Sequence, residues 1–127
     1  MNREVVLSKE VMIVSETDQK GNILYANDDF CKISGYSKTE LKGKAHNVVR
    51  HKDMPRAAFE DLWSTLKRGD IWNGIVKNST KDGDYYWVNA TVFTSHTKDG
   101  TIRYISVRVK PTKEEIENAI SLYKTLN

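Results

Sequence analysis

The sequence predicts an α+β fold in which helices cover one face of a single five-stranded antiparallel sheet. Three observations lead to this prediction. Strand-like segments flank a central stretch of helical sequence, and Asp-Gly pairs divide the later strand-like segments, where glycine tolerates the positive φ of tight hairpin turns. The 127 residues, of which 39% are hydrophobic, suffice for one core and leave no room for a second.

Turn sequences mark the ends of the strands. Residues 19–22 (QKGN) separate two apolar runs and predict an N-terminal hairpin, while Asp82-Gly83 and Asp99-Gly100 predict two later hairpins. The expected strands cover about Val11–Ser15, Ile23–Ala26, Trp72–Ser79, Tyr85–His96 and Ile102–Lys110.

Helical sequence fills the gap between the second and third strands. Asn27 or Asp28 is a candidate N-cap of a short helix, and residues 37–40 (SKTE) have the spacing of a capping box. Pro55 suits the first turn of a longer helix that ends at Gly69, because apolar residues recur there at three- and four-residue spacing. These residues are Ala58, Phe59, Leu62, Trp63 and Leu66.

The chain divides into three parts. Residues 1–10 are expected to form an N-terminal cap segment, and residues 11–111 form the folded domain. Residues 112–127 are expected to form a terminal helix with a narrow apolar line, which follows a hinge at Pro111. We expect this helix to serve output or assembly more than core stability.

Composition excludes several classes of protein. Twenty Lys and Arg against seventeen Asp and Glu give a net charge of +3, which is too small and too evenly mixed to predict nucleic-acid binding. The single cysteine, Cys31, excludes an internal disulfide framework and a Cys-rich zinc site and favours a reducing, cytoplasmic setting. Residues 1–10 lack a signal-peptide core, and the apolar runs fall far short of the ~20 residues that cross a bilayer, so no direct membrane insertion is expected.

Four short motifs carry a resemblance over almost the whole chain. They are residues 25–30 (YANDDF), 34–37 (SGYS), 40–43 (ELKG) and 81–87 (KDGDYYW). With the order of elements, they resemble a PAS domain, which implies the PAS fold for residues 11–111. Four longer motifs, at 46–55 (HNVVRHKDMP), 61–63 (DLW), 72–78 (WNGIVKN) and 114–116 (EEI), are similar to the flavin-binding PAS domain of bacterial aerotaxis receptors of the Aer type.

The resemblance implies a function in sensing. Such a domain binds FAD non-covalently and signals redox or oxygen status, and thus energy status, to a methyl-accepting chemotaxis-type signalling protein or region. The chain resembles only the sensor part of such receptors. A homodimer through the sheet face or the terminal helices is an open possibility.

Residues 50–53 (RHKD), just before the Pro55 helix, are the most informative cluster. The phosphates of a dinucleotide need cationic donors, and a helix N-terminus supplies further N–H groups. The alternative is a solvated charged loop capped by Asp53. The resemblance implies FAD contact, with Arg50 on phosphate or ribityl oxygens and with His51 and Asp53 shaping the loop. His46 and Asn47 either bond the ribityl chain or hold the loop.

One face of the third strand is a candidate pocket wall. Trp72, Gly74, Val76 and Asn78 alternate on it, and the isolated glycine leaves room for a flat group to approach the sheet. We expect Trp72 to form a wall of the flavin pocket. The resemblance places Asn78 near the isoalloxazine ring, and the alternative is a residue that bonds the turn at 81–84.

Trp63 and Asn27 complete the candidates on the helical side. Trp63 is a candidate cofactor contact, but a tryptophan on an amphipathic helix more often packs in the core. Asn27 lies within the first of the matching motifs and is a candidate cofactor residue besides a candidate helix cap.

The last two strands each present two plausible faces. Hydrophobicity alone turns Ile105, Val107 and Val109 of the last strand toward the core. The resemblance implies the opposite face, with Arg108 reaching the flavin, and the alternative is a surface arginine. On the strand before it, the resemblance leaves Trp87 on the outer face, where terminal segments or a second subunit would cover it.

Residue types suited to other chemistries are also present. His46, His51, Asp53 and Glu60 offer acids and bases, but no nucleophile elbow, phosphate loop or zinc-binding His pattern accompanies them, so the chain is not expected to be an enzyme or to bind a metal ion. A haem-binding PAS gas sensor, with His46, His51 or His96 as ligand, and a cofactor-free PAS interaction module remain as alternatives. Cys31 lies outside residues 47–51, where light-sensing flavin PAS domains carry their reactive cysteine, so we expect an inert, buried thiol.

Overall fold

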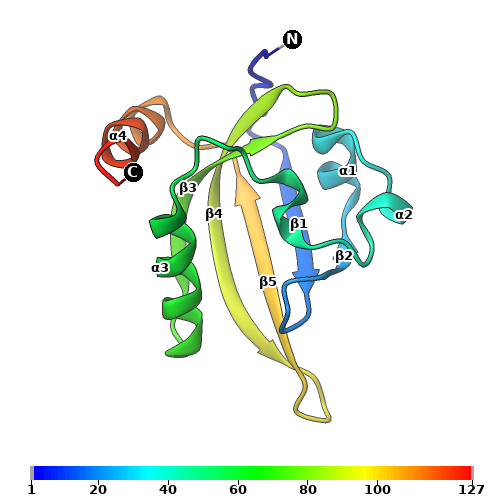
Figure 1. Ribbon diagram of the computed structural model, residues 1–127. Helices are drawn as coiled ribbons and strands as arrows, with labels where there is room; N and C mark the ends of the chain where they lie inside the picture. Colours follow the sequence, from blue (N-terminus) through cyan, green and yellow to red (C-terminus); the bar gives the residue numbers. More distant parts are fainter. Residues whose placement is uncertain (1, 127) are drawn as a thin grey trace.

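The computed structural model describes residues 2–126 and confirms the antiparallel five-stranded sheet with helices (Figure 1). The strand order is β2-β1-β5-β4-β3, so the last strand in the sequence lies at the centre of the sheet. The strands are β1 (Met12–Thr17), β2 (Ile23–Ala26), β3 (Trp72–Ser79), β4 (Tyr85–His96) and β5 (Ile102–Val109). The sequence located all five to within two residues at either end.

Local chemistry fixes where the helices begin. Asn27 caps α1, and the predicted capping box of Ser37 and Glu40 is present at α2. Pro55 occupies the N-cap position of α3 rather than its first turn, and Thr112 with Glu115 forms a second capping box at α4. The helices are α1 (Asp28–Ser34), α2 (Lys38–Leu41), the 3₁₀ helix η1 (His46–Val49), α3 (Arg56–Lys67) and α4 (Lys113–Lys124).

The helices differ from the sequence prediction in two respects. The 3₁₀ helix η1 at residues 46–49 was not expected. The terminal helix ends at Lys124, and the last expected residue, Asn127, lies outside the described residues. Within residues 2–126, none of the helices has the length and apolar content needed to cross a membrane.

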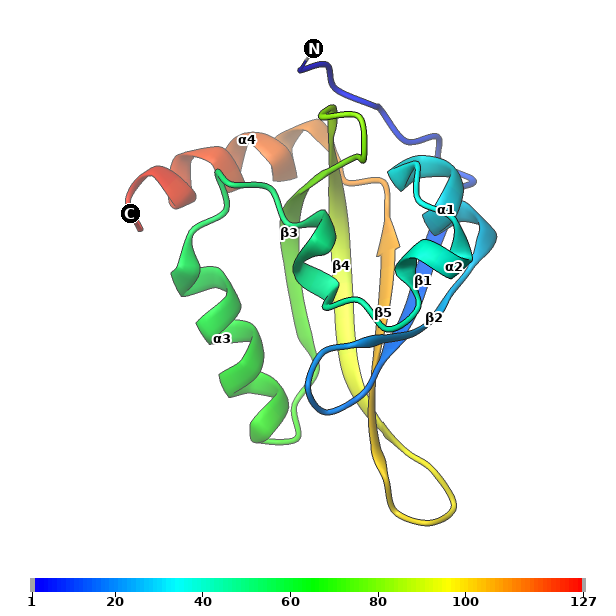
Figure 2. The ribbon, with the colours of Figure 1, turned by 45° about the vertical axis from the view of Figure 1, so that its right-hand side comes forward.

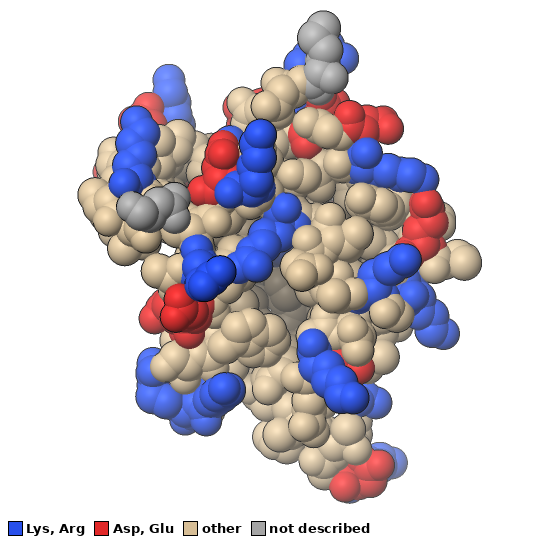
Figure 3. All heavy atoms as spheres, in the orientation of Figure 1, with Lys and Arg blue, Asp and Glu red and all other residues tan. Residues whose placement is uncertain are grey.

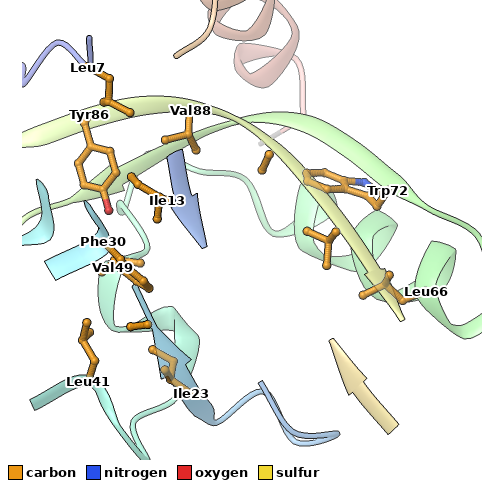
Figure 4. Close-up of a cluster of buried hydrophobic side chains, with 13 residues drawn as sticks. Leu7, Ile13, Ile23, Phe30, Leu41, Val49, Leu66, Trp72, Tyr86 and Val88 are labelled. Carbon is orange, nitrogen blue, oxygen red and sulfur yellow. The ribbon is translucent and has the colours of Figure 1, made fainter. Parts of the chain in front are cut away.

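The inner face of the sheet carries the core (Figure 4). Tyr86 and Val88 of β4 and Ile13 of β1 are fully buried on this face, together with Phe30 of α1. On β5 the inward side chain is Arg108, which is only 2% exposed. The assignment by hydrophobicity alone is therefore wrong for β5: its apolar set faces outward, because the helices that close the core lie on the other side.

The outer face of β3 and β4 is covered by α4, which lies on the opposite side of the sheet from α3 (Figure 2). Glu115 of α4 accepts a hydrogen bond from Asn89 Nδ2 at 3.0 Å, and the Tyr123 hydroxyl donates to the carbonyl of Ile75. Trp87 lies on the outer face, as expected, yet is only 7% exposed. A terminal segment thus covers part of the outer sheet face.

The N-terminal segment also attaches to the sheet. Tyr85 N donates to Arg3 O at 2.9 Å, and Val5 N donates to Tyr85 O at 2.7 Å. Leu7 enters the core with 3% exposure. Glu4 therefore forms an isolated parallel bridge with Tyr85, the first residue of β4, which β5 does not reach.

We expect α4 to be dispensable for folding. A chain that ends at Pro111 loses the contacts of Ala119 and Tyr123 but keeps every core residue of the inner face. It should unfold cooperatively, with a Tm lowered by about 5 °C, in thermal denaturation followed by circular dichroism. Loss of the cooperative transition would make α4 part of the core and contradict its assignment to output or assembly.

Candidate ligand-binding site

A cavity of about 290 Å³ lies between the inner face of the sheet, α3 and η1. Strand residues from β1, β3, β4 and β5 form its floor, and side chains of α3 form one wall. Figure 3 shows the molecule hollowed near the middle of this face, with Lys and Arg side chains around the hollow. The volume is close to the lower end of the ~300–1,000 Å³ that is usual for small-molecule sites.

Arg108 is the central polar group of the cavity. Its Nη2 donates to Ser15 Oγ at 2.6 Å, and its Nη1 donates to His46 Nε2 at 3.2 Å. The guanidinium carbon lies 4.6 Å from the centre of the Phe30 ring. No carboxylate among the described residues forms an ion pair with Arg108, and its buried Nε has no hydrogen-bond partner there.

This arrangement leaves a positive charge without a counter-charge. Burial lowers the pKa of Arg108 to about 10, so the guanidinium stays protonated at neutral pH. A buried cation costs several kcal/mol unless an anion or strong hydrogen-bond acceptors compensate it. The cavity is therefore suited to a ligand with negative charge or electron-rich acceptor atoms.

His46 is held neutral beside this cation. Burial and the charge of Arg108 lower the pKa of His46 to about 3. Its Nε2 accepts from Arg108 and also lies 3.0 Å from Ser15 Oγ, which leaves the ring proton on Nδ1. The Nε2 atom of His46 is therefore engaged by protein groups of β1 and β5.

Trp72 forms part of the cavity wall, in a conformation that Gly74 makes possible. The six-membered ring of Trp72 lies over Gly74, where an added Cβ would come within 2.4 Å of it. The indole Nε1 donates to Asp61 Oδ2 of α3 at 2.8 Å. The room beside the glycine is thus filled by the tryptophan of the same strand, which corrects the expectation that it is open to a flat ligand.

Trp63 lies on the opposite wall. Its ring meets the edge of Tyr104 at 5.3 Å between centroids, and both rings line the cavity. The general preference for a tryptophan in the core is met only in part here, because Trp63 is half-buried and borders the open space.

Asn78 and Tyr86 are cross-strand partners on the inner face. Asn78 lines the cavity and is 4% exposed. The buried Tyr86 hydroxyl has no hydrogen-bond partner among the described residues. Burial raises the pKa of Tyr86 to about 12, although the nearby Arg108 and Asn78 act in the opposite direction.

Cations and polar groups line the mouth of the cavity. Arg50 follows η1, and its guanidinium carbon lies 3.5 Å from the centre of the Phe59 ring of α3. Asn47 and Lys20 line the same opening. Burial, and to a lesser degree the charge of Arg56, lower the pKa of Arg50. Arg50 thus places a guanidinium at this opening.

His51 and Asp53 lie outside the cavity. His51 Nδ1 accepts a hydrogen bond from Asp53 N at 3.0 Å, and the imidazole meets the Tyr85 ring edge-on. Asp53 pairs with Lys77 Nζ at 2.9 Å. Both residues belong to the loop that carries Arg50 and do not line the main cavity, although His51 lines a separate surface hollow beside Arg50.

Asn27 and Cys31 also lie outside the lining of the cavity. The Asn27 side chain accepts from the backbone N–H groups of Val14 and Phe30 and donates to Met12 O. The bond from Phe30 caps α1, and the other two join the start of this helix to β1. Cys31 is half-buried on α1, and burial raises the pKa of its thiol, which keeps it protonated.

Sequence reasoning missed Ser15, although the pattern that reveals it was present. Ile13, Ser15 and Thr17 alternate along β1, so the two hydroxyls share the face of a core isoleucine. Phe59, which lines the cavity, was missed as a site residue. Its helix was predicted correctly, but the packing of α3 over the sheet is a tertiary contact that local patterns do not contain.

A five-stranded antiparallel sheet whose inner face is covered by helices and encloses a cavity is the architecture of the PAS class of domains. A sequence profile described as the PAS fold matches residues 23–107, and the chain belongs to this family. The light-state structure of the blue-light photoreceptor Aureochrome1 LOV shares the fold, with a TM-score of 0.75 at 18% identity over 88% of this chain and 91% of that one.

Two bacterial proteins are similar to this chain in sequence. The aerotaxis receptor of Escherichia coli (strain K12) is 47% identical over 121 residues, which are 95% of this chain and 24% of the receptor. The nitrogen fixation regulatory protein of Klebsiella oxytoca is 33% identical over 62% of this chain and 16% of its own length. The chain therefore spans about a quarter or less of these relatives.

The neutral state of His46 predicts a pH dependence of stability. Between pH 6.5 and about 3 the unfolded chain binds a proton at this histidine and the folded chain does not, so stability is full above pH 6.5 and falls as the pH is lowered. The slope should reach up to about 1.4 kcal/mol per pH unit in urea denaturation between pH 4.5 and 6.5.

His46→Gln should reduce this slope and His96→Gln, on the exposed tip of β4, should leave it unchanged. Some slope will persist in the His46 variant, because burial also lowers the pKa of His51. An unaltered slope in His46→Gln would mean that His46 is not held neutral in the folded protein.

Proposed function

We propose that this chain is a sensor module that binds FAD non-covalently and reports redox or oxygen status to a chemotaxis-type signalling protein or region. The observation that carries the proposal is the buried, uncompensated guanidinium of Arg108 in the wall of the cavity. The relation to a protein named as an aerotaxis receptor supports the signalling context.

The cavity residues fit a flavin. A bound flavin would supply reversible electron transfer, which no side chain of the cavity provides. Arg108 would stabilise negative charge on a reduced ring, and Asn78 offers both a donor and an acceptor to a polar ring edge. Trp63 and Trp72 provide apolar walls, while Arg50 at the mouth suits the phosphates of a dinucleotide.

Haem is a weaker candidate because the histidines are engaged or remote. His46 Nε2 faces Ser15 and Arg108, and His51 Nδ1 accepts from a backbone N–H. His96 is exposed and is absent from the cavity lining. Release of the cofactor from the purified protein, followed by chromatography against FAD, FMN and haem standards, tests the proposal, and recovery of haem or of no cofactor would contradict it.

The output side of the module is α4 and the outer sheet face. Apolar residues of α4 remain exposed, including Ile120 and Leu122, at 39% and 55%. This surface suits a signalling partner or a second copy of the chain. In this proposal the module works in the cytoplasm and needs no enzymatic activity of its own.

Arg50→Ala should weaken FAD binding without unfolding the domain. A charge-assisted contact to phosphate is worth roughly 1.5–3 kcal/mol, so the Kd for FAD should rise about 10- to 150-fold in a fluorescence titration. Lys52→Ala is the matched control, since Lys52 is an exposed cation of the same loop that is absent from the cavity lining. An unchanged Kd in the Arg50 variant would remove Arg50 from the site.

Arg108→Gln should make the bound flavin harder to reduce. The buried cation favours reduced, anionic forms, so its loss should lower the midpoint potential by at least about 30 mV in a redox titration. The ligand-free variant should be no less stable than the wild type, because the neutral amide brings no uncompensated charge into the core. A midpoint unchanged within error, with flavin bound, would place Arg108 away from the ring.

A further inference from the structure

Lys77 is an unusually confined cation on the outer face of the sheet. Its Nζ lies 2.9 Å from Asp53 Oδ2 and 4.5 Å from the centre of the Tyr85 ring. The centre of the Trp87 ring lies 5.8 Å from the same atom. Only 16% of the Lys77 side chain is exposed. The ammonium therefore sits among two aromatic rings and a carboxylate, although the cavity lies on the opposite face.

The carboxylate belongs to the segment that carries Arg50. Residues 50–54 run along the free edge of β3, and their backbone attachments are weak. His51 N reaches Lys77 O at 3.4 Å, and Lys77 N donates to the Met54 sulfur at 3.3 Å. A thioether is a weak acceptor, and a 3.4 Å bond is at the long end of the range. The ion pair of Asp53 with Lys77 is thus the strongest polar contact between this segment and the strand.

We propose that Lys77 is a positioning residue that holds residues 50–54 against the edge of β3 and so keeps Arg50 at the cavity mouth. The Arg50 part of this inference rests on the proposed function. This proposal also gives His51 and Asp53 a role. Asp53 forms the ion pair with Lys77, and the His51 ring packs against the Tyr85 ring.

Because Lys77 is confined, its ion pair with Asp53 stabilises the attachment of residues 50–54 more than an exposed pair would. Exposed ion pairs contribute little, because two flexible side chains must be ordered and water screens the charges. Asp53 is 58% exposed, but Lys77 is already ordered by Tyr85 and Trp87, which attract its charge through their ring faces. Less entropy is therefore lost when the pair forms. In accord with this, Lys77 lowers the pKa of Asp53.

The experiment compares Lys77→Met, Asp53→Asn and the double variant with the wild-type chain. Two quantities are measured for each: the Kd for added FAD and the amide hydrogen exchange of residues 50–54 in the ligand-free protein. Met keeps the length and apolar contacts of Lys77 but removes the charge. Lys77→Arg is the conservative variant, because a guanidinium can also pair with Asp53 and stack on the rings.

Lys81→Met is the matched control. Lys81 also pairs with a carboxylate, Glu40 at 2.6 Å, and lies 5.9 Å from the Tyr36 ring, but it contacts no residue of the 50–54 segment. Its removal should change neither the Kd for FAD nor the exchange of residues 50–54.

Lys77→Met and Asp53→Asn should each raise the Kd for FAD about three- to tenfold and accelerate hydrogen exchange at residues 50–54. The double variant should show the same Kd and the same exchange rate as either of these single variants. Lys77→Arg should restore both quantities. Additive effects of the two substitutions, or exchange equal to that of the wild type, would overturn the inference. If the wild-type chain binds no FAD, the proposed function fails, while hydrogen exchange still decides whether Lys77 holds the segment.

Discussion

The burial of Arg108 is the constraint on which the site depends. β5 is the central strand, and its inward cation meets Ser15 of β1, His46 of η1 and Phe30 of α1. The fold supplies neutral acceptors and an aromatic face but no carboxylate among the described residues. The folded core bears the cost of this desolvated charge, and the cavity beside it becomes a place where negative or electron-rich groups are stabilised.

The titratable groups around this cation are kept neutral. His46 has a pKa of about 3 and Tyr86 one of about 12, in both cases mainly because of burial. Over the physiological pH range neither adds a charge to the inner cavity. The field inside is therefore set by Arg108, and that at the mouth by Lys20 and Arg50. A site of this kind responds to the charge of its ligand more than to the pH of the solution.

β3 is the element that connects the cavity to the rest of the surface. Its inner face presents Trp72 and Asn78, its edge binds the segment at 50–54, and the carbonyl of Ile75 accepts a hydrogen bond from Tyr123 of α4. The outward side chain of Lys77 joins the loop to the outer face. A change at the cavity mouth and a change in the docking of α4 thus act on the same eight-residue strand.

The sequence by itself determined the local elements: the five strands, the caps at Asn27 and Ser37 and the apolar stripe of α3, because each depends on residues within one turn or one hairpin. Among the candidate site residues that the sequence named, Trp72, Asn78 and Arg50 do line the cavity. Tertiary structure decided the rest. Alternation along β5 yields two faces but not which one is covered. The pairing of β5 with β1 brings Arg108 to Ser15, 93 residues away, and the helices packed on the sheet bury it there. The contact between Trp72 and Gly74, and the turn of His51 and Asp53 away from the cavity, likewise depend on three-dimensional packing that no local pattern encodes.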